Sequence, residues 1–107
     1  MTLKEKKPLA WRVFQKGEPI PGKNPDLHRL DAYGTLIYWP HHGKPWEMGW
    51  EIDHRKPLSK GGSNNIRNLQ PTHWKTNRQK GATYPFGIES VDPLPVSRLL
   101  KPARKRK

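Results

Sequence analysis

Residues 49–54, Gly-Trp-Glu-Ile-Asp-His, are the most informative part of the sequence, because they predict a strand that ends in an acid and an imidazole. Side chains alternate between the two faces of a strand, so Trp50 and Ile52 share one face. Glu51 and Asp53 share the other. We therefore expect the first face to pack on the core and the second face to carry groups that are available for chemistry.

The residues after this strand predict a loop, a second strand and a helix. Residues 55–67 are polar and contain two adjacent glycines, which accept turn conformations that other residues resist. A brief strand at 69–70 should follow. Thr72 is a suitable N-cap, so we expect a helix over 73–80 that is closed by Gly81 at its C-terminal end.

The residues before the strand are less regular. Residues 9–14 are apolar and aromatic enough for a short strand or a turn of helix. Residues 17–26 are punctuated by Pro and Gly and are expected to be loop. Residues 27–31 fit a helical turn, and 33–39 read as a strand because they are rich in β-branched and aromatic side chains.

The composition describes one small, strongly basic domain. The chain has 107 residues, 32% of them hydrophobic, and its formal net charge is +12. This charge points to a polyanionic partner, nucleic acid before an anionic membrane surface, since no amphipathic helix supports the membrane alternative. The absence of cysteine rules out disulfides and thiolate zinc sites. No apolar run is long enough for a membrane helix or a signal peptide, so we expect a soluble, non-secreted protein.

Candidate metal ligands come from separate segments. Residues four apart on a helix share a face, so His73 and Asn77 can reach one ion together, and Asp53 can supply a third ligand. Oxygen and imidazole ligands suit one Mg²⁺ or Mn²⁺ ion, or Ni²⁺ or Zn²⁺ if His73 binds. His73 could instead be a residue of the first helical turn that bonds a nearby backbone group.

His54 is the candidate general base. It should project from the strand end on the side opposite Asp53, where its imidazole could take a proton from water that attacks a phosphodiester. The Asn68 amide, just before the second strand, can bond backbone groups across the loop and hold His54 in line. Four cationic side chains are candidates for contacts with phosphate groups: Arg55, Lys56, Lys60 and Arg78.

These residues resemble the HNH endonuclease family, which belongs to the ββα-metal or His-Me finger superfamily. The resemblance rests on residues 50–54, 57, 59–62, 68–70 and 77–81. It implies that His54 is the general base, that Asp53 and Asn77 bind metal, and that Asn68 is structural. His73 matches a helix position that is a ligand in some members only.

One departure from the family concerns structural zinc. Many HNH proteins carry two Cys-x-x-Cys pairs beside the site, and the positions of the second pair hold His73 and Thr76 here. We expect no structural zinc on cysteines, and stability that comes from aromatic packing instead.

We therefore predict an α+β fold, a small single domain centred on a ββα-metal finger, with long loops and a flexible basic C-terminal tail. The predicted organisation is a flexible N-terminus over 1–8, the nuclease domain over 9–90 with its core motif at 49–81, and a Pro-rich and basic tail over 91–107.

The predicted activity is metal-dependent hydrolysis of DNA, by nicking or by double-strand cleavage. Double-stranded DNA is the expected partner, and the protein should be a monomer or a weak homodimer without membrane association. A phage or mobile element is a natural setting for such a protein, in the cytoplasm, and the basic tail would also suit a nuclear protein. The alternatives are a noncatalytic nucleic-acid-binding module and an RNA-directed nuclease.

Other residues have ordinary structural interpretations as well as functional ones. Glu51 could orient an arginine near the scissile phosphate, Arg29 being one candidate, or form a surface salt bridge worth little. Residues 98–107 carry six positive side chains and no acid, which fits a phosphate-binding arm, a nuclear-localisation-like signal or a solubilising tail. Three histidines are expected to be solvated loop residues: His28, His41 and His42.

Overall fold

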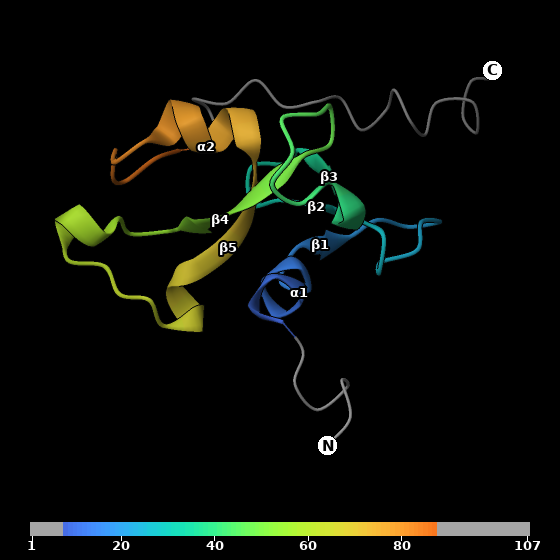
Figure 1. Cartoon of the computed structure of the whole chain (residues 1–107), viewed down its shortest axis with the longest axis horizontal. Coiled ribbons are helices and arrows are strands. Elements are labelled where there is room, and N and C mark those ends of the chain that lie inside the picture. Colours follow the sequence, from blue (N-terminus) through green and yellow to red (C-terminus); the bar gives the residue numbers. More distant parts are fainter. Residues whose placement is uncertain (1–7, 88–107) are drawn as a thin grey trace.

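The computed structural model describes residues 8–87, which form two helices and five strands. Their order along the chain is visible in Figure 1. The elements are α1 (Leu9–Phe14), β1 (Glu18–Pro19), β2 (His28–Leu30), β3 (Leu36–Tyr38), β4 (Trp50–His54), β5 (Leu69–His73) and α2 (Trp74–Lys80). Apart from Pro8, the terminal segments predicted to be flexible lie outside the described residues. Neither helix of the described part has the length and apolar character that crossing a bilayer demands.

The strands form two antiparallel sheets. One has the order β1-β2-β3 and the other consists of β4 and β5. In the second sheet Asp53 lies opposite Gln70, and Glu51 lies opposite Thr72. Helix α2 follows β5 directly and lies beside the β4–β5 hairpin (Figure 1). The predicted α+β class and its ββα unit are confirmed.

The core joins α1 to the β4–β5 sheet and to the segment after β3 through aromatic contacts. The rings of Phe14 and Trp50 lie 5.2 Å apart between centroids, and those of Trp39 and Trp50 lie 5.8 Å apart. Ile52 packs against the same core cluster. The face of β4 that was expected to be apolar therefore does pack inward. Trp50 and Phe14 are the largest side chains of the described residues that are fully buried, and each large ring removes much apolar area from water.

Two local predictions are wrong, both because strand pairing extends further than the local sequence indicates. Residues 27–31 are not a helical turn, since His28–Leu30 pairs with Leu36–Tyr38 in a β ladder. The second strand is also longer than predicted and runs through Thr72, which is therefore not a helix cap. Pro71 is tolerated there because a two-stranded sheet has only edge strands, where a missing N–H need not break a ladder bond.

A buried aspartate holds the two sheets together. One oxygen of Asp31 accepts the backbone N–H groups of Tyr33 and Thr35, and the other accepts the N–H of His73, each at 2.9 Å. Burial raises the pKa of Asp31, and these three backbone donors counteract part of that shift. The junction between β5 and α2 is thereby fixed against the β2–β3 turn.

Candidate active site

His54 lies at the end of β4 with its ring partly exposed. Its Nε2 lies 2.7 Å from Oδ1 of Asn64 in the loop between β4 and β5. An amide oxygen can only accept, so Nε2 carries the ring proton and Nδ1 keeps a lone pair. In this tautomer Nδ1 is the nitrogen that can accept a proton.

Asn68 ties the two ends of the same loop together. Its Oδ1 accepts the N–H of Lys56 at 2.9 Å, and its Nδ2 donates to the carbonyl groups of Lys56 and Ser63 at 3.0 and 2.7 Å. Gly62 allows this closure, because a Cβ atom there would lie 1.8 Å from the Lys56 carbonyl oxygen. The loop is thus folded back on the residues that directly follow His54.

Asp53 is buried, and both of its carboxylate oxygens have partners. One carboxylate oxygen accepts hydrogen bonds from Gln70 Nε2 and Thr72 Oγ1, both at 3.0 Å. The other lies 3.1 Å from the ammonium group of Lys80, and the side chains of this ion pair are only 4% and 2% exposed. Lys80 also donates to the carbonyl oxygen of His54 at 2.8 Å. Sequence reasoning missed Lys80, although its position three residues after Asn77 places it on the same helix face.

Asn77 reaches β4 from α2. Its Nδ2 donates to Glu51 Oε1 at 2.7 Å, which leaves the amide oxygen as the atom that could bind a cation. Arg78 lies 3.5 Å from the other oxygen of Glu51. Arg29 is not the arginine that Glu51 orients, because its guanidinium is bonded to the Gln15 and Gly17 carbonyl groups at 3.0 and 2.8 Å.

One cavity of about 250 Å³ brings the central residues together, since Asp53, His54, Asn77 and Lys80 all line it. Asp53, His54 and Asn77 therefore share one concave surface, although a loop and strand β5 separate Asn77 from the other two residues in sequence. Asn68 lies outside this lining and acts on it through the loop.

His73 bonds nearby backbone groups, which is the alternative to metal binding that the sequence left open. It is the N-cap of α2, where its Nδ1 accepts the N–H of Lys75 at 3.2 Å, and its Nε2 lies 2.7 Å from the Glu47 carbonyl oxygen. Both ring nitrogens are thus occupied, and His73 does not line the cavity with Asn77. A cap residue lies outside the helix proper, so the four-residue spacing does not put these two side chains on one face.

The donor set fits a divalent cation through oxygen atoms. The Asp53 carboxylate and the Asn77 amide oxygen are hard ligands of the kind that Mg²⁺ and Mn²⁺ prefer. Residues 8–87 contain no cluster of three His, Cys, Asp or Glu side chains that could hold an ion unaided. Water and phosphate oxygens would have to complete the coordination, and an ion on Asp53 would share that carboxylate with the Lys80 ammonium group.

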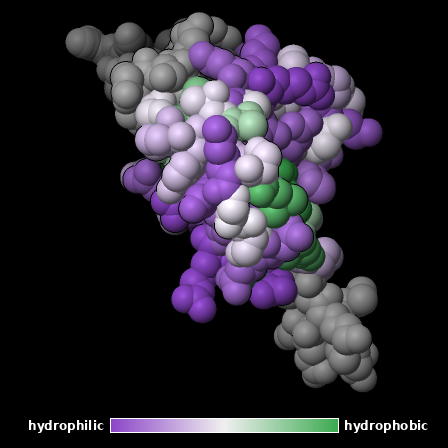
Figure 2. Space-filling view, turned by 90° about the vertical axis from the view of Figure 1, so that its left-hand side faces the viewer, coloured by the Kyte–Doolittle hydropathy of each residue, from purple (hydrophilic) through white to green (hydrophobic). Residues whose placement is uncertain are grey.

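The four candidate phosphate-binding side chains are all exposed: Arg55, Lys56, Lys60 and Arg78. Figure 2 views the molecule from the side where the loop between β4 and β5 lies, and this face is predominantly hydrophilic. The Arg78 guanidinium lies over the Trp74 ring, 5.2 Å from its centroid, as in a cation–π contact.

The remaining histidines all contact aromatic rings. His28 and His41 are partly buried and belong to regular elements, which corrects the expectation of solvated loop residues, whereas His42 is an exposed loop residue as expected. His28 stacks on Tyr38 with centroids 4.7 Å apart, and His42 lies 4.4 Å from the Trp50 ring. Burial lowers the pKa of both imidazoles. His41 meets Trp46 edge to face at 4.9 Å.

Comparison with known proteins agrees with this geometry. Residues 39–83 match the model of the HNH endonuclease family, and this range includes β4, β5 and α2. The part of the chain that forms the site therefore matches the HNH endonuclease domain, and the resemblance inferred from the sequence is confirmed. The domain supports nuclease activity and a nucleic-acid substrate. No match was found among curated proteins or among solved structures.

Proposed function

We propose that this protein is a metal-dependent endonuclease that hydrolyses DNA phosphodiester bonds, with His54 as the general base. The observation that supports the proposal best is the cavity in which a partly exposed imidazole with a free Nδ1 lies beside Asp53 and Asn77. A neutral imidazole nitrogen that makes no hydrogen bond can take a proton from water, and a positioned base contributes roughly 10²–10⁴ in rate.

Asp53 and Asn77 would hold one Mg²⁺ or Mn²⁺ ion, and His73 serves the fold as a helix cap. When bound, the ion supplies positive charge that stabilises the negative charge developing on phosphate oxygens. The protein's own residues fix the rest of the geometry. Lys80 holds the His54 backbone through its carbonyl, Asn64 orients the ring, and exposed cations bind flanking phosphates.

The proposal is tested by the substitution His54→Ala. Cleavage of plasmid DNA in Mg²⁺ should fall at least about a hundredfold, because the base is lost. DNA affinity, measured by fluorescence anisotropy in EDTA, should stay nearly unchanged. His28→Ala, on a different sheet, is the matched control and should cut like the parent. Equal nicking by the His54→Ala variant and the parent would refute the assignment.

The metal and the substrate are tested with the parent protein. Cleavage should require Mg²⁺ or Mn²⁺ and disappear in EDTA. If no divalent ion, Ni²⁺ and Zn²⁺ included, supports cleavage of DNA or RNA, the protein is a nucleic-acid-binding module. Cleavage of RNA in preference to DNA would make it an RNA-directed nuclease.

A further inference from the structure

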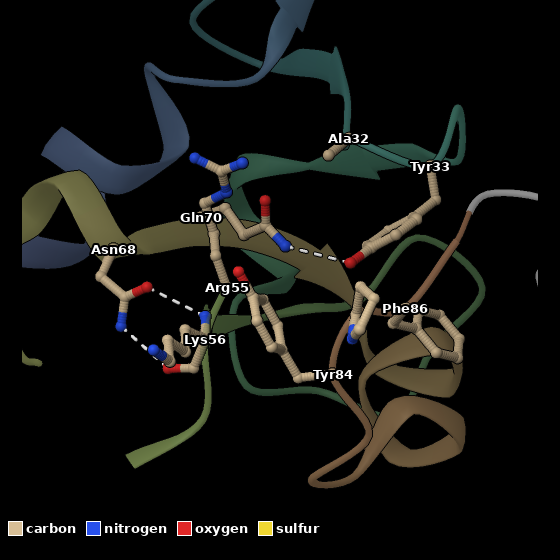
Figure 3. Close-up of a pocket in the computed structure, with 9 residues that line it drawn as sticks. Ala32, Tyr33, Arg55, Lys56, Asn68, Gln70, Tyr84 and Phe86 are labelled. Carbon is tan, nitrogen blue, oxygen red and sulfur yellow. Dashed lines mark hydrogen bonds between the residues drawn. The ribbon is translucent and has the colours of Figure 1, made fainter. Parts of the chain in front are cut away.

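A second concavity, of about 570 Å³, adjoins the end of β4 and shares no lining residue with the cavity around His54. Figure 3 shows that its walls come from segments far apart in sequence: the β2–β3 turn, the residues after β4, strand β5, and the segment after α2. Its lining includes three aromatic rings, two cations and two amides: Tyr33, Tyr84, Phe86, Arg55, Lys56, Asn68 and Gln70.

The rings in this pocket differ in what they can still contact. Tyr33 is buried and meets Phe86 edge to face, with centroids 5.5 Å apart. Tyr84 is 49% exposed, and the Lys56 ammonium lies 5.9 Å from its ring centroid. An exposed ring beside cations is the arrangement on which nucleobases stack while their phosphates are neutralised.

The pocket also contains a hydrogen-bond donor, the hydroxyl group of Tyr33. The Tyr33 hydroxyl oxygen accepts from Gln70 Nε2 at 3.3 Å, as drawn in Figure 3, so its own hydrogen can be donated elsewhere. Burial raises the pKa of Tyr33, as do the nearby carboxylates of Asp53 and Asp31. The hydroxyl therefore keeps its proton and can donate it to a carbonyl or ring nitrogen of a base.

Gln70 links this pocket to the proposed active site. Its Nε2 donates both to Tyr33 and to the Asp53 carboxylate, at 3.3 and 3.0 Å. Arg55 and Lys56 directly follow His54 along the chain. A DNA strand with one phosphate at His54 would bring a neighbouring nucleotide to these rings.

We infer that the pocket binds one unpaired nucleobase of the strand being cut, stacked on Tyr84 and bonded by Tyr33. This inference rests on the proposed function. A paired base hides its faces within the duplex, so occupation of the pocket requires a bulged, flipped or single-stranded nucleotide. The preferred substrate is then DNA that carries an unpaired base beside the scissile phosphate.

The test uses the full chain with His54→Ala, in EDTA, so that DNA is bound and not cut. Two short duplexes are compared by fluorescence anisotropy, one fully paired and one with a single bulged 5-iodouracil. The bulged duplex should bind roughly tenfold more tightly, within the range expected for one stacked base. Adding Tyr84→Ala should remove that preference. Trp46→Ala is the matched control, because Trp46 is 50% exposed but lies outside the pocket, and it should keep the preference.

Irradiation of the bound bulged duplex gives a second measurement, which does not depend on whether the Tyr84→Ala variant folds. The 5-iodouracil should crosslink to Tyr84 or Tyr33, as mapped by mass spectrometry. A crosslink elsewhere, or an equal loss of preference in the Tyr84→Ala and Trp46→Ala variants, would overturn the inference. These failures would leave cleavage by the parent protein intact, whereas failure of the proposed function appears as absence of that cleavage.

Discussion

At the scale of single residues, the position of the proposed base depends on hydrogen bonds from two other side chains, Asn64 and Lys80. Asn64 fixes the tautomer of His54 through one hydrogen bond of 2.7 Å. Lys80 is a buried cation whose loss would leave the Asp53 carboxylate without its charged partner, which commonly costs about 3–5 kcal/mol of stability. Both residues act on the strand end that carries the proposed base.

The role of Asn64 predicts a specific loss. Asn64→Ala removes the acceptor that holds the Nε2 proton, so the cleavage rate should fall by at least about tenfold, a part of what a positioned base supplies. DNA affinity should not change. Asn65→Ala is the control, because Asn65 accepts from Arg67 N and does not contact His54, and its rate should stay near that of the parent. Similar rates for the Asn64→Ala variant and the parent would contradict this role.

At the scale of elements, the start of α2 decides what His73 does. The strand β5 extends to His73, so the helix begins one residue later and His73 becomes its cap. Asp31 fixes this junction from the neighbouring sheet. The cap and the metal-ligand interpretations make different predictions for the same substitutions.

His73→Ala should lower the free energy of unfolding by at least about 1 kcal/mol, because an N-cap acceptor and a buried ring are lost. His73→Asn keeps a capping acceptor and should lose less. Urea unfolding measures both. The Mg²⁺ concentration that gives half-maximal cleavage should be the same in both variants as in the parent, and a large increase in that concentration would identify His73 as a ligand after all.

The predictability of the fold also differs by element. Strand β4 could be predicted because the alternation of apolar and acidic side chains is a local pattern. The end of α2 at Gly81 could be predicted because helix capping also depends on local residues. Strand β2 was not readable, since its pairing with β3 is decided across a turn. Asn64 and Lys80 were missed for a related reason: the first depends on how the loop closes, and the second on how α2 packs over β4.

At the scale of the whole molecule, the net charge of +12 predicts a steep salt dependence. If about six phosphates are neutralised, DNA affinity should drop roughly 10³-fold between about 50 and 200 mM salt. Deleting residues 98–107, which carry six positive side chains, should flatten this slope without abolishing cleavage. An unchanged slope after the deletion would show that the tail does not contact DNA.

The contacts of α1 with the β4–β5 hairpin bear on whether the HNH region can fold when it is separated from the residues before it. Val13 and Phe14 complete the core around Trp50, and Lys16 donates to the carbonyl groups of Ile66 and Leu69. The stretch that matches the HNH family model, residues 39–83, contains none of these N-terminal residues. Transplanted alone into a fusion enzyme, that stretch would expose the indole of Trp50. A functional cassette for protein engineering must therefore start upstream, at the first helix.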